Sequence, residues 1–137
     1  MKIRLDDVMQ SLSFPLNAVY YYYIPLETVL MFMDGMIFGK AVYGISSEED
    51  VLRHGEDFIK LPDIGDEGRR KVMTGFINTI GDDRAKEKLY GALSGGLSAF
   101  EAALREQHRI MDWYNYRESV YTEFSRKWCE KEGLELI

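Results

Sequence analysis

The chain has 137 residues, of which 46% are hydrophobic and 29% charged, and its formal net charge is −6. This composition excludes a disordered tail, a collagen-like repeat and a disulfide-rich scaffold. The length is that of one ordinary domain, and a chain of this size needs neither a metal nor a disulfide to build its core. We therefore expect a single domain over residues 1–137.

The first residues and the single cysteine indicate the cellular compartment of the protein. Cys129 cannot form a disulfide within the chain, and beside Trp128 it has the pattern of a packed residue in a protein from a reducing compartment. Asp6 and Asp7 interrupt the segment in which a secretory signal needs its apolar run. Residues 8–26 carry no charge, but their prolines and polar side chains make them too broken and too polar to span a membrane. We expect a cytoplasmic protein without a membrane partner.

The chain opens with the pattern of a short helix followed by strands. Apolar residues at helical spacing predict an amphipathic helix over residues 5–12, which should end before Pro15. The aromatic run at 18–24 and the apolar run at 29–33 are rich in residues that favour strands.

A hairpin and one more strand complete the first half. Asp34–Gly35 suits a tight turn between the run at 29–33 and a short extension at 36–38. A polar connection at 46–57 leaves room for one helical turn, and the alternating residues 58–61 form a last short strand. We expect these strands to form an antiparallel sheet.

Helical spacing dominates after Pro62. An apolar stripe over residues 72–80 predicts a helix that Gly81 stops. Asp82 or Asp83 begins a second helix, which Gly95–Gly96 ends.

Two more helices follow. Ser98 and Glu101 have the spacing of a capping box, which predicts that a third helix opens at Ser98. The fourth and longest helix spans the aromatic repeat at 113–128, and Gly133 is well placed to end it. That repeat predicts three core residues on one side of the helix: Trp113, Phe124 and Trp128.

These elements together predict an α+β fold. We expect the small antiparallel sheet from the N-terminal half to pack against a helical layer from the C-terminal half, with the last helix as its spine.

Several short apolar and aromatic motifs follow one another along the chain. They are Tyr23-Ile24, Phe58-Ile59-Lys60-Leu61-Pro62, Met73-x-x-Phe76-Ile77, Gly96-Leu97-Ser98-Ala99-Phe100, Trp113-Tyr114-x-Tyr116-Arg117, and Trp128 followed by Gly133. Their order and spacing resemble those of the bacterial uncharacterised protein family 0158 over about residues 3–136. The resemblance implies a bacterial cytoplasmic α+β domain and transfers no catalytic residue.

The sequence offers no recognisable catalytic, cofactor or metal site. His54, His108 and Cys129 are not paired at the spacing of metal ligands, and no serine lies in a nucleophile elbow. The glycines at 95–96 lack the lysine of a phosphate-binding loop. We therefore predict no catalytic residue, no cofactor and no metal, and favour a noncatalytic interaction or regulatory module. The alternative is a small enzyme or ligand-binding protein with a cleft that the sequence does not reveal.

Basic residues in the second half do not predict nucleic-acid binding. Groups such as Arg69–Lys71 and Arg126–Lys127 are interleaved with acids, whereas affinity for a phosphate backbone depends on uncompensated positive charge.

The aromatic strand is the best sequence candidate for an interaction surface. Alternation along a strand sends Tyr20 and Tyr22 to one face and Tyr21 and Tyr23 to the other, so that both faces carry aromatic rings. Either the fold covers both faces, or one of them contacts a second copy of the chain or another protein. The candidate surface residues are Tyr20, Tyr21, Tyr22, Tyr23, Met31, Phe32 and Met33.

Overall fold

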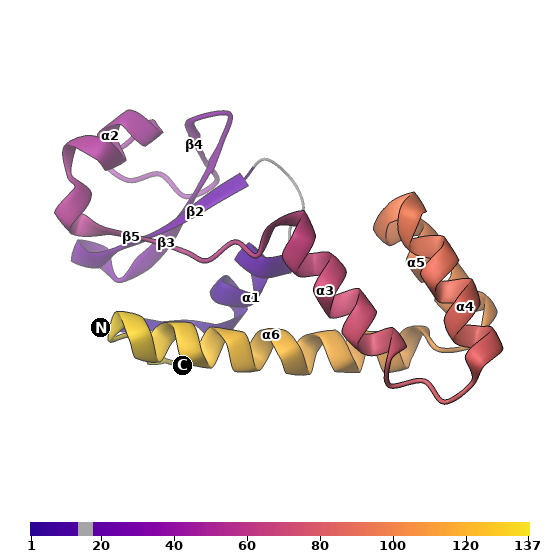
Figure 1. Cartoon of the computed structure of the whole chain (residues 1–137). Coiled ribbons are helices and arrows are strands. Elements are labelled where there is room, and N and C mark those ends of the chain that lie inside the picture. Colours follow the sequence, from indigo (N-terminus) through magenta and orange to yellow (C-terminus); the bar gives the residue numbers. More distant parts are fainter. Residues whose placement is uncertain (14–17) are drawn as a thin grey trace. The chain divides into compact units, whose positions relative to one another are not determined.

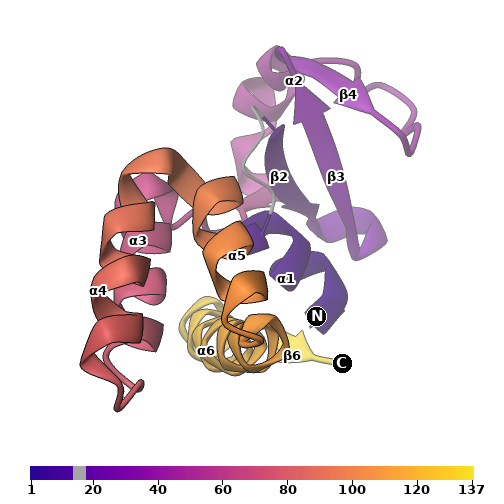
Figure 2. The same cartoon turned by 90° about the vertical axis from the view of Figure 1, so that its right-hand side faces the viewer.

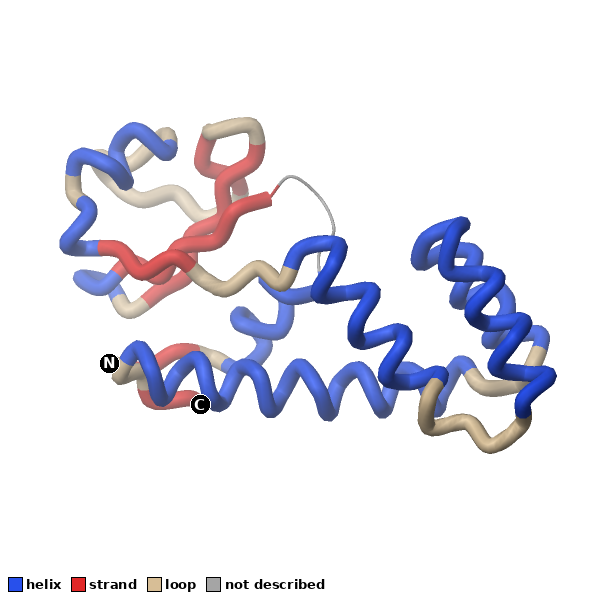
Figure 3. The backbone as a smooth tube through the Cα atoms, in the orientation of Figure 1, coloured by secondary structure: helices blue, strands red, loops and turns tan. Residues whose placement is uncertain are grey.

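The computed structural model describes residues 1–13 and 18–137, and its helices and the strands of its larger sheet are labelled in Figure 1. The chain divides into a sheet unit, Met1–Asp63 with Thr122–Ile137, and a helical unit, Ile64–Tyr121. The α+β class is confirmed, because the four-stranded antiparallel sheet comes from the N-terminal half and most of the helix from the C-terminal half (Figure 3). That the two units behave as a single domain stays a prediction.

The sheet has the order β4–β3–β2–β5. Its strands are β2 (Ala18–Tyr23), β3 (Thr28–Met33), β4 (Met36–Phe38) and β5 (Phe58–Lys60). All neighbouring strands are antiparallel, and the predicted hairpin turn between β3 and β4 is present. Asp34 and Gly35 adopt φ angles of 52° and 80°, the left-handed conformation that a two-residue turn of this kind requires.

Each face of the sheet has its own apolar cover within the sheet unit. On one face, Tyr20 and Tyr22 belong to a buried cluster that also contains Ile3, Val8, Leu61, Cys129 and Leu134. On the other face, Leu30 and Phe32 pack with Ile45 and Val51, the latter from α2 (Glu48–Arg53). Tyr21 and Tyr23 pack on this second face, where the Tyr21 and Phe32 ring centroids lie 5.6 Å apart. The 3-10 turns η1 (Ile24–Leu26) and η2 (Gly55–Asp57) adjoin the strand ends.

The first cover includes a pairing that the sequence does not predict. Strand β1 (Lys2–Ile3) pairs in parallel with β6 (Glu135–Leu136), and α1 (Leu5–Ser13) follows β1 directly. The predicted helix over residues 5–12 is therefore confirmed, whereas Pro15, which was expected to stop it, lies outside the described residues. Strands of two residues carry no periodic signal, which is why the pairing of β1 with β6 escapes prediction.

The helical unit contains α3 (Gly65–Ile77), α4 (Asp83–Ala92), the 3-10 turn η3 (Leu93–Gly95), α5 (Gly96–Glu106) and the first half of α6 (Ile110–Glu132). Helix α4 runs beside both α3 and α5 (Figure 2). Asp82 caps α4 as predicted, since its Oδ1 atom accepts hydrogen bonds from the backbone N–H groups of Arg84 and Ala85. Trp113 lies in the core of this unit, with its ring centroid 5.1 Å from that of Phe100.

Several sequence predictions are wrong in the helical part of the chain. Helices α3 and α4 end at Ile77 and Ala92, before the predicted stops at Gly81 and Gly95–Gly96. Helix α5 begins at Gly96, which has a φ of 81° and leads straight from η3 into the helix, so Ser98 lies in the first turn rather than at the cap. On α6, Trp113 is buried and Trp128 partly buried, but Phe124 is 40% exposed. The buried positions in the C-terminal half of α6 are Tyr121, Ser125 and Cys129. Their i, i+4 spacing defines the buried side of the helix there. Phe124 does not belong to this series, and its ring is partly exposed to solvent.

Gly75 on α3 permits a close helix contact, which gives a first prediction. A Cβ atom at Gly75 would lie 2.6 Å from the hydroxyl oxygen of Tyr116 and 3.7 Å from the ring carbon that bears it. We expect Gly75→Ala to lower the free energy of unfolding by about 1–3 kcal/mol, because the new methyl group overlaps this oxygen.

Tyr116→Phe removes the oxygen and should rescue the alanine variant. In the Tyr116→Phe variant, Gly75→Ala should raise the free energy of unfolding by up to about 1 kcal/mol, because alanine has a higher helix propensity than glycine. Urea denaturation of the wild type, both single variants and the double variant measures the coupling. Equal losses from Gly75→Ala with and without the Tyr116 hydroxyl would contradict the contact.

Candidate functional site

The structure places the seven candidate surface residues together on β2 and β3, but mostly inside the sheet unit. Tyr20, Tyr22 and Phe32 are buried, and the other four are partly buried: Tyr21, Tyr23, Met31 and Met33. The fold covers both faces of the strand, which is the first of the two alternatives that the sequence leaves open. The three buried residues therefore offer no exposed area to a partner.

Exposed apolar side chains lie next to these residues instead. Met36 and Phe38 on β4 are 56% and 57% exposed. They pair with Met33 and Met31, so all four side chains point to the face of the sheet that carries Tyr20 and Tyr22. The cover on that face thus leaves the β4 end open to solvent.

A charged cleft lies in the sheet unit. It has a volume of about 580 Å³. Its walls come from β1, the start of α1, the β2–β3 hairpin, the segment after β4 and Ile137. The lining residues are Lys2, Ile3, Arg4, Asp7, Tyr22, Leu26, Glu27, Thr28, Val29, Lys40 and Ile137.

Local hydrogen bonds build one wall of the cleft. The Tyr22 hydroxyl donates to the backbone carbonyl oxygen of Lys2 at 2.8 Å, which attaches β1 to the sheet. The backbone N–H of Lys2 donates to Glu27 Oε1 at 3.3 Å. Glu27 follows the turn η1 with a φ of 46°, and this left-handed conformation reverses the chain into β3. The turn therefore presents Glu27 to β1.

Asp7 is the partly buried carboxyl group of the cleft. Burial raises its pKa, while the positive charges of Arg4 and Lys40 act in the opposite direction and Asp6 adds to the rise. The Lys40 ammonium also donates a hydrogen bond to the Thr28 hydroxyl. The cleft thus combines three basic side chains, two carboxyl groups and apolar walls.

Of the cleft residues, only Tyr22 is among the candidate surface residues that the sequence predicts. The charged residues of the cleft are not predicted as a site, because they come from separate segments of the chain. The one usable signal is Lys40, which is the only basic residue between Arg4 and Arg53.

A second group of polar side chains surrounds η2. One possible ligand atom each from His54, Glu56 and Asp57 lies within 4.8 Å of the others. All three residues belong to a single exposed or half-exposed turn. Cys129 is buried, and burial raises the pKa of its thiol, so the prediction of a packed cysteine is confirmed.

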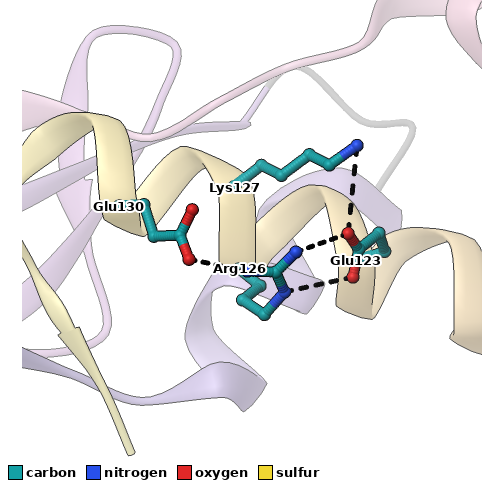
Figure 4. A network of polar contacts seen from close by, with 4 residues as sticks. All are labelled: Glu123, Arg126, Lys127 and Glu130. Atoms are coloured by element: carbon teal, nitrogen blue, oxygen red, sulfur yellow. Dashed lines mark hydrogen bonds and ion pairs between the residues drawn. The ribbon is translucent and has the colours of Figure 1, made fainter.

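The basic pair at Arg126 and Lys127 is neutralised on its own helix. Arg126 contacts both Glu123 oxygens and Glu130 at 2.6–3.1 Å, and Lys127 lies 3.8 Å from Glu123 (Figure 4). The hydrogen bonds and charge of Arg126 lower the pKa of Glu123. This exposed network occupies charges that a nucleic-acid surface would need free, and the absence of nucleic-acid binding stays a prediction.

Comparison with family models, curated proteins and solved structures finds no match to the chain. The resemblance to family 0158 therefore stays a hypothesis. Within the described part of the chain, no helix has both the length and the apolar character needed to cross a lipid bilayer.

Two tyrosines of β2 provide a matched test of the cover beside the cleft. Tyr20 is 6% exposed, and its hydroxyl has no hydrogen-bond partner among the described residues. We expect Tyr20→Phe to raise the free energy of unfolding by up to about 1 kcal/mol, because it removes an unsatisfied buried group. Tyr22→Phe should lower it by about 1 kcal/mol, because the bond to Lys2 is lost. Chemical denaturation measures the free energy of unfolding of both variants. Changes of the same sign would contradict the assignment of an unsatisfied hydroxyl to Tyr20 and a hydrogen-bonded one to Tyr22.

Asp7 predicts a pH dependence of stability. Its pKa is raised in the folded chain, so the folded chain holds this proton more tightly than the unfolded chain does. Stability therefore falls as Asp7 ionises. We expect Asp7→Asn to gain stability relative to the wild type as the pH rises from about 3 to about 6. Urea denaturation across this range measures the difference.

Asp6→Asn is the matched control, since it removes one negative charge from an exposed residue of the same helical turn. The same pH trend in both variants would contradict a specific role for the burial of Asp7.

Proposed function

We propose that the chain is a noncatalytic regulatory module that binds a small molecule in the cleft of the sheet unit. The observation that carries this proposal is the cleft itself, whose volume of about 580 Å³ is typical of small-molecule sites. Ile3, Leu26 and Val29 provide apolar walls, and charged residues line the same cleft. Small-molecule sites commonly combine these two features.

A binding role suits this cleft better than a catalytic one. Its lining residues include no histidine and no cysteine. Thr28 is the only serine or threonine among the lining residues. Its hydroxyl accepts a hydrogen bond from the Lys40 ammonium, whereas a nucleophilic hydroxyl would donate to a base. The proposed setting is a bacterial cytoplasm, which rests on the family resemblance and on the single cysteine.

NMR titration of the full chain tests this function. A panel of small molecules of different charge should include members that shift the backbone signals of the cleft residues. Leu26→Trp should abolish these shifts, because a large ring at this 60% exposed wall position occupies the cleft. Leu52→Trp is the matched control, at an 83% exposed leucine outside the cleft, and should leave binding unchanged. Shifts that persist in Leu26→Trp would contradict the proposal.

A protein contact at β4 is the second candidate function. Met36 and Phe38 are more than half exposed beside Met31 and Met33, and methionine-rich apolar surfaces are adaptable contact surfaces. A second copy of the chain is the proposed partner, through a two-fold contact of the same surface. Sedimentation equilibrium of the full chain distinguishes this homodimer from a monomer.

A further inference from the structure

The charges of the cleft are the reverse of those of the surrounding chain. Residues 1–65 contain five basic and ten acidic side chains. Three of the five basic side chains line the cleft, but only two of the ten acidic ones do. The cleft is therefore a local excess of positive charge in an acidic chain.

We propose that the ligand of this cleft is a small organic anion, with a carboxylate or phosphate group held by Lys2, Arg4 and Lys40. Its apolar part contacts Tyr22, Leu26 and Val29. This inference rests on the proposed binding function and adds the chemical class of the ligand.

The three cations are available to such a ligand. Among the described residues, the Lys2 side chain has no hydrogen-bond or ion-pair partner, and Lys40 donates only to a neutral hydroxyl. Arg4 lies 4.0 Å from Asp6, but these two side chains are 71% and 87% exposed. A long ion pair between exposed groups is weak, so a ligand anion can replace it at little cost.

The two acidic residues do not prevent anion binding. Glu27 is engaged by the backbone N–H of Lys2 in holding β1 at the turn. Asp7 is partly buried, and the charges of Arg4 and Lys40 act on it. In its protonated form this carboxyl group can donate a hydrogen bond to an anion. Its ionised form would repel the ligand, so Asp7→Asn should strengthen binding at neutral pH.

Four probes with the same ring and different head groups test the ligand class on the full chain. They are benzoate, phenyl phosphate, benzyl alcohol and benzylamine, used in NMR titrations at low salt. We expect benzoate or phenyl phosphate to shift the cleft signals, and the stronger of the two identifies the preferred anionic group. Inorganic phosphate should bind more weakly than phenyl phosphate, because it lacks the part that contacts the apolar wall.

Charge-removing variants locate the binding groups. Lys2→Gln, Arg4→Gln and Lys40→Gln should each weaken binding of the anion by about tenfold, the loss typical of one charge-assisted contact. Arg53→Gln and Lys60→Gln are the matched controls, since they remove the other two basic side chains of residues 1–65, and they should leave the affinity unchanged. Circular dichroism checks that every variant is folded.

The outcomes separate this inference from the proposed function. Cleft shifts with benzylamine or benzyl alcohol, but not with the anions, would overturn the anionic class and leave small-molecule binding intact. Anion binding that all five glutamine variants weaken equally would show a general effect of charge and overturn the assigned groups. If neither these probes nor the wider panel shifts the cleft signals, both proposals fail.

Discussion

The sheet unit depends on one constraint, which is that β2 carries aromatic side chains on both faces. A strand of this kind is stable only when apolar groups cover each side. Helix α2 and Ile45 supply one cover. The other is assembled from segments far apart in the sequence, namely Ile3 of β1, Val8 of α1, and Cys129 and Leu134 near the end of the chain. The parallel pairing of β1 with β6 joins the two ends of this second cover.

The cleft follows from the way in which that second cover is attached. Strand β1 has only two residues, and the hydrogen bond from Tyr22 to Lys2 fixes it to the sheet. Tyr22 thus fills the core with its ring and positions the cleft wall with its hydroxyl. The β2–β3 turn reaches β1 through the hydrogen bond from the Lys2 N–H to Glu27, and Leu26 and Glu27 line the cleft beside this contact. The cleft is therefore a direct consequence of a narrow cover on a strand with two aromatic faces.

The sequence predicts those parts of the fold that local chemistry determines. The Asp34–Gly35 turn, the Asp82 cap and the end of α6 at Gly133 each depend on a few neighbouring residues; at Gly133 the N–H of Leu134 reaches the Cys129 carbonyl at 2.9 Å. The inner side of α6 is harder to predict, because small or polar residues such as Ser125 occupy it while the larger Phe124 does not. The cleft is not predictable, because its cations become neighbours only when separate segments fold together.

Charged side chains of the sheet unit outside the cleft differ from those inside it, because the former form local helix caps and ion pairs. The acidic run at 48–50 begins α2, and there the backbone N–H groups of Ser46 and Ser47 lower the pKa of Asp50. Arg53 ends the same helix and pairs with Asp50 at 3.6 Å. These charges stabilise local structure. Lys2 and Lys40 neither cap a helix nor pair with a carboxylate within the described residues. Folding therefore brings three basic and two acidic side chains to one concave place. The excess of positive side-chain charge there is what the proposed anionic ligand would complement.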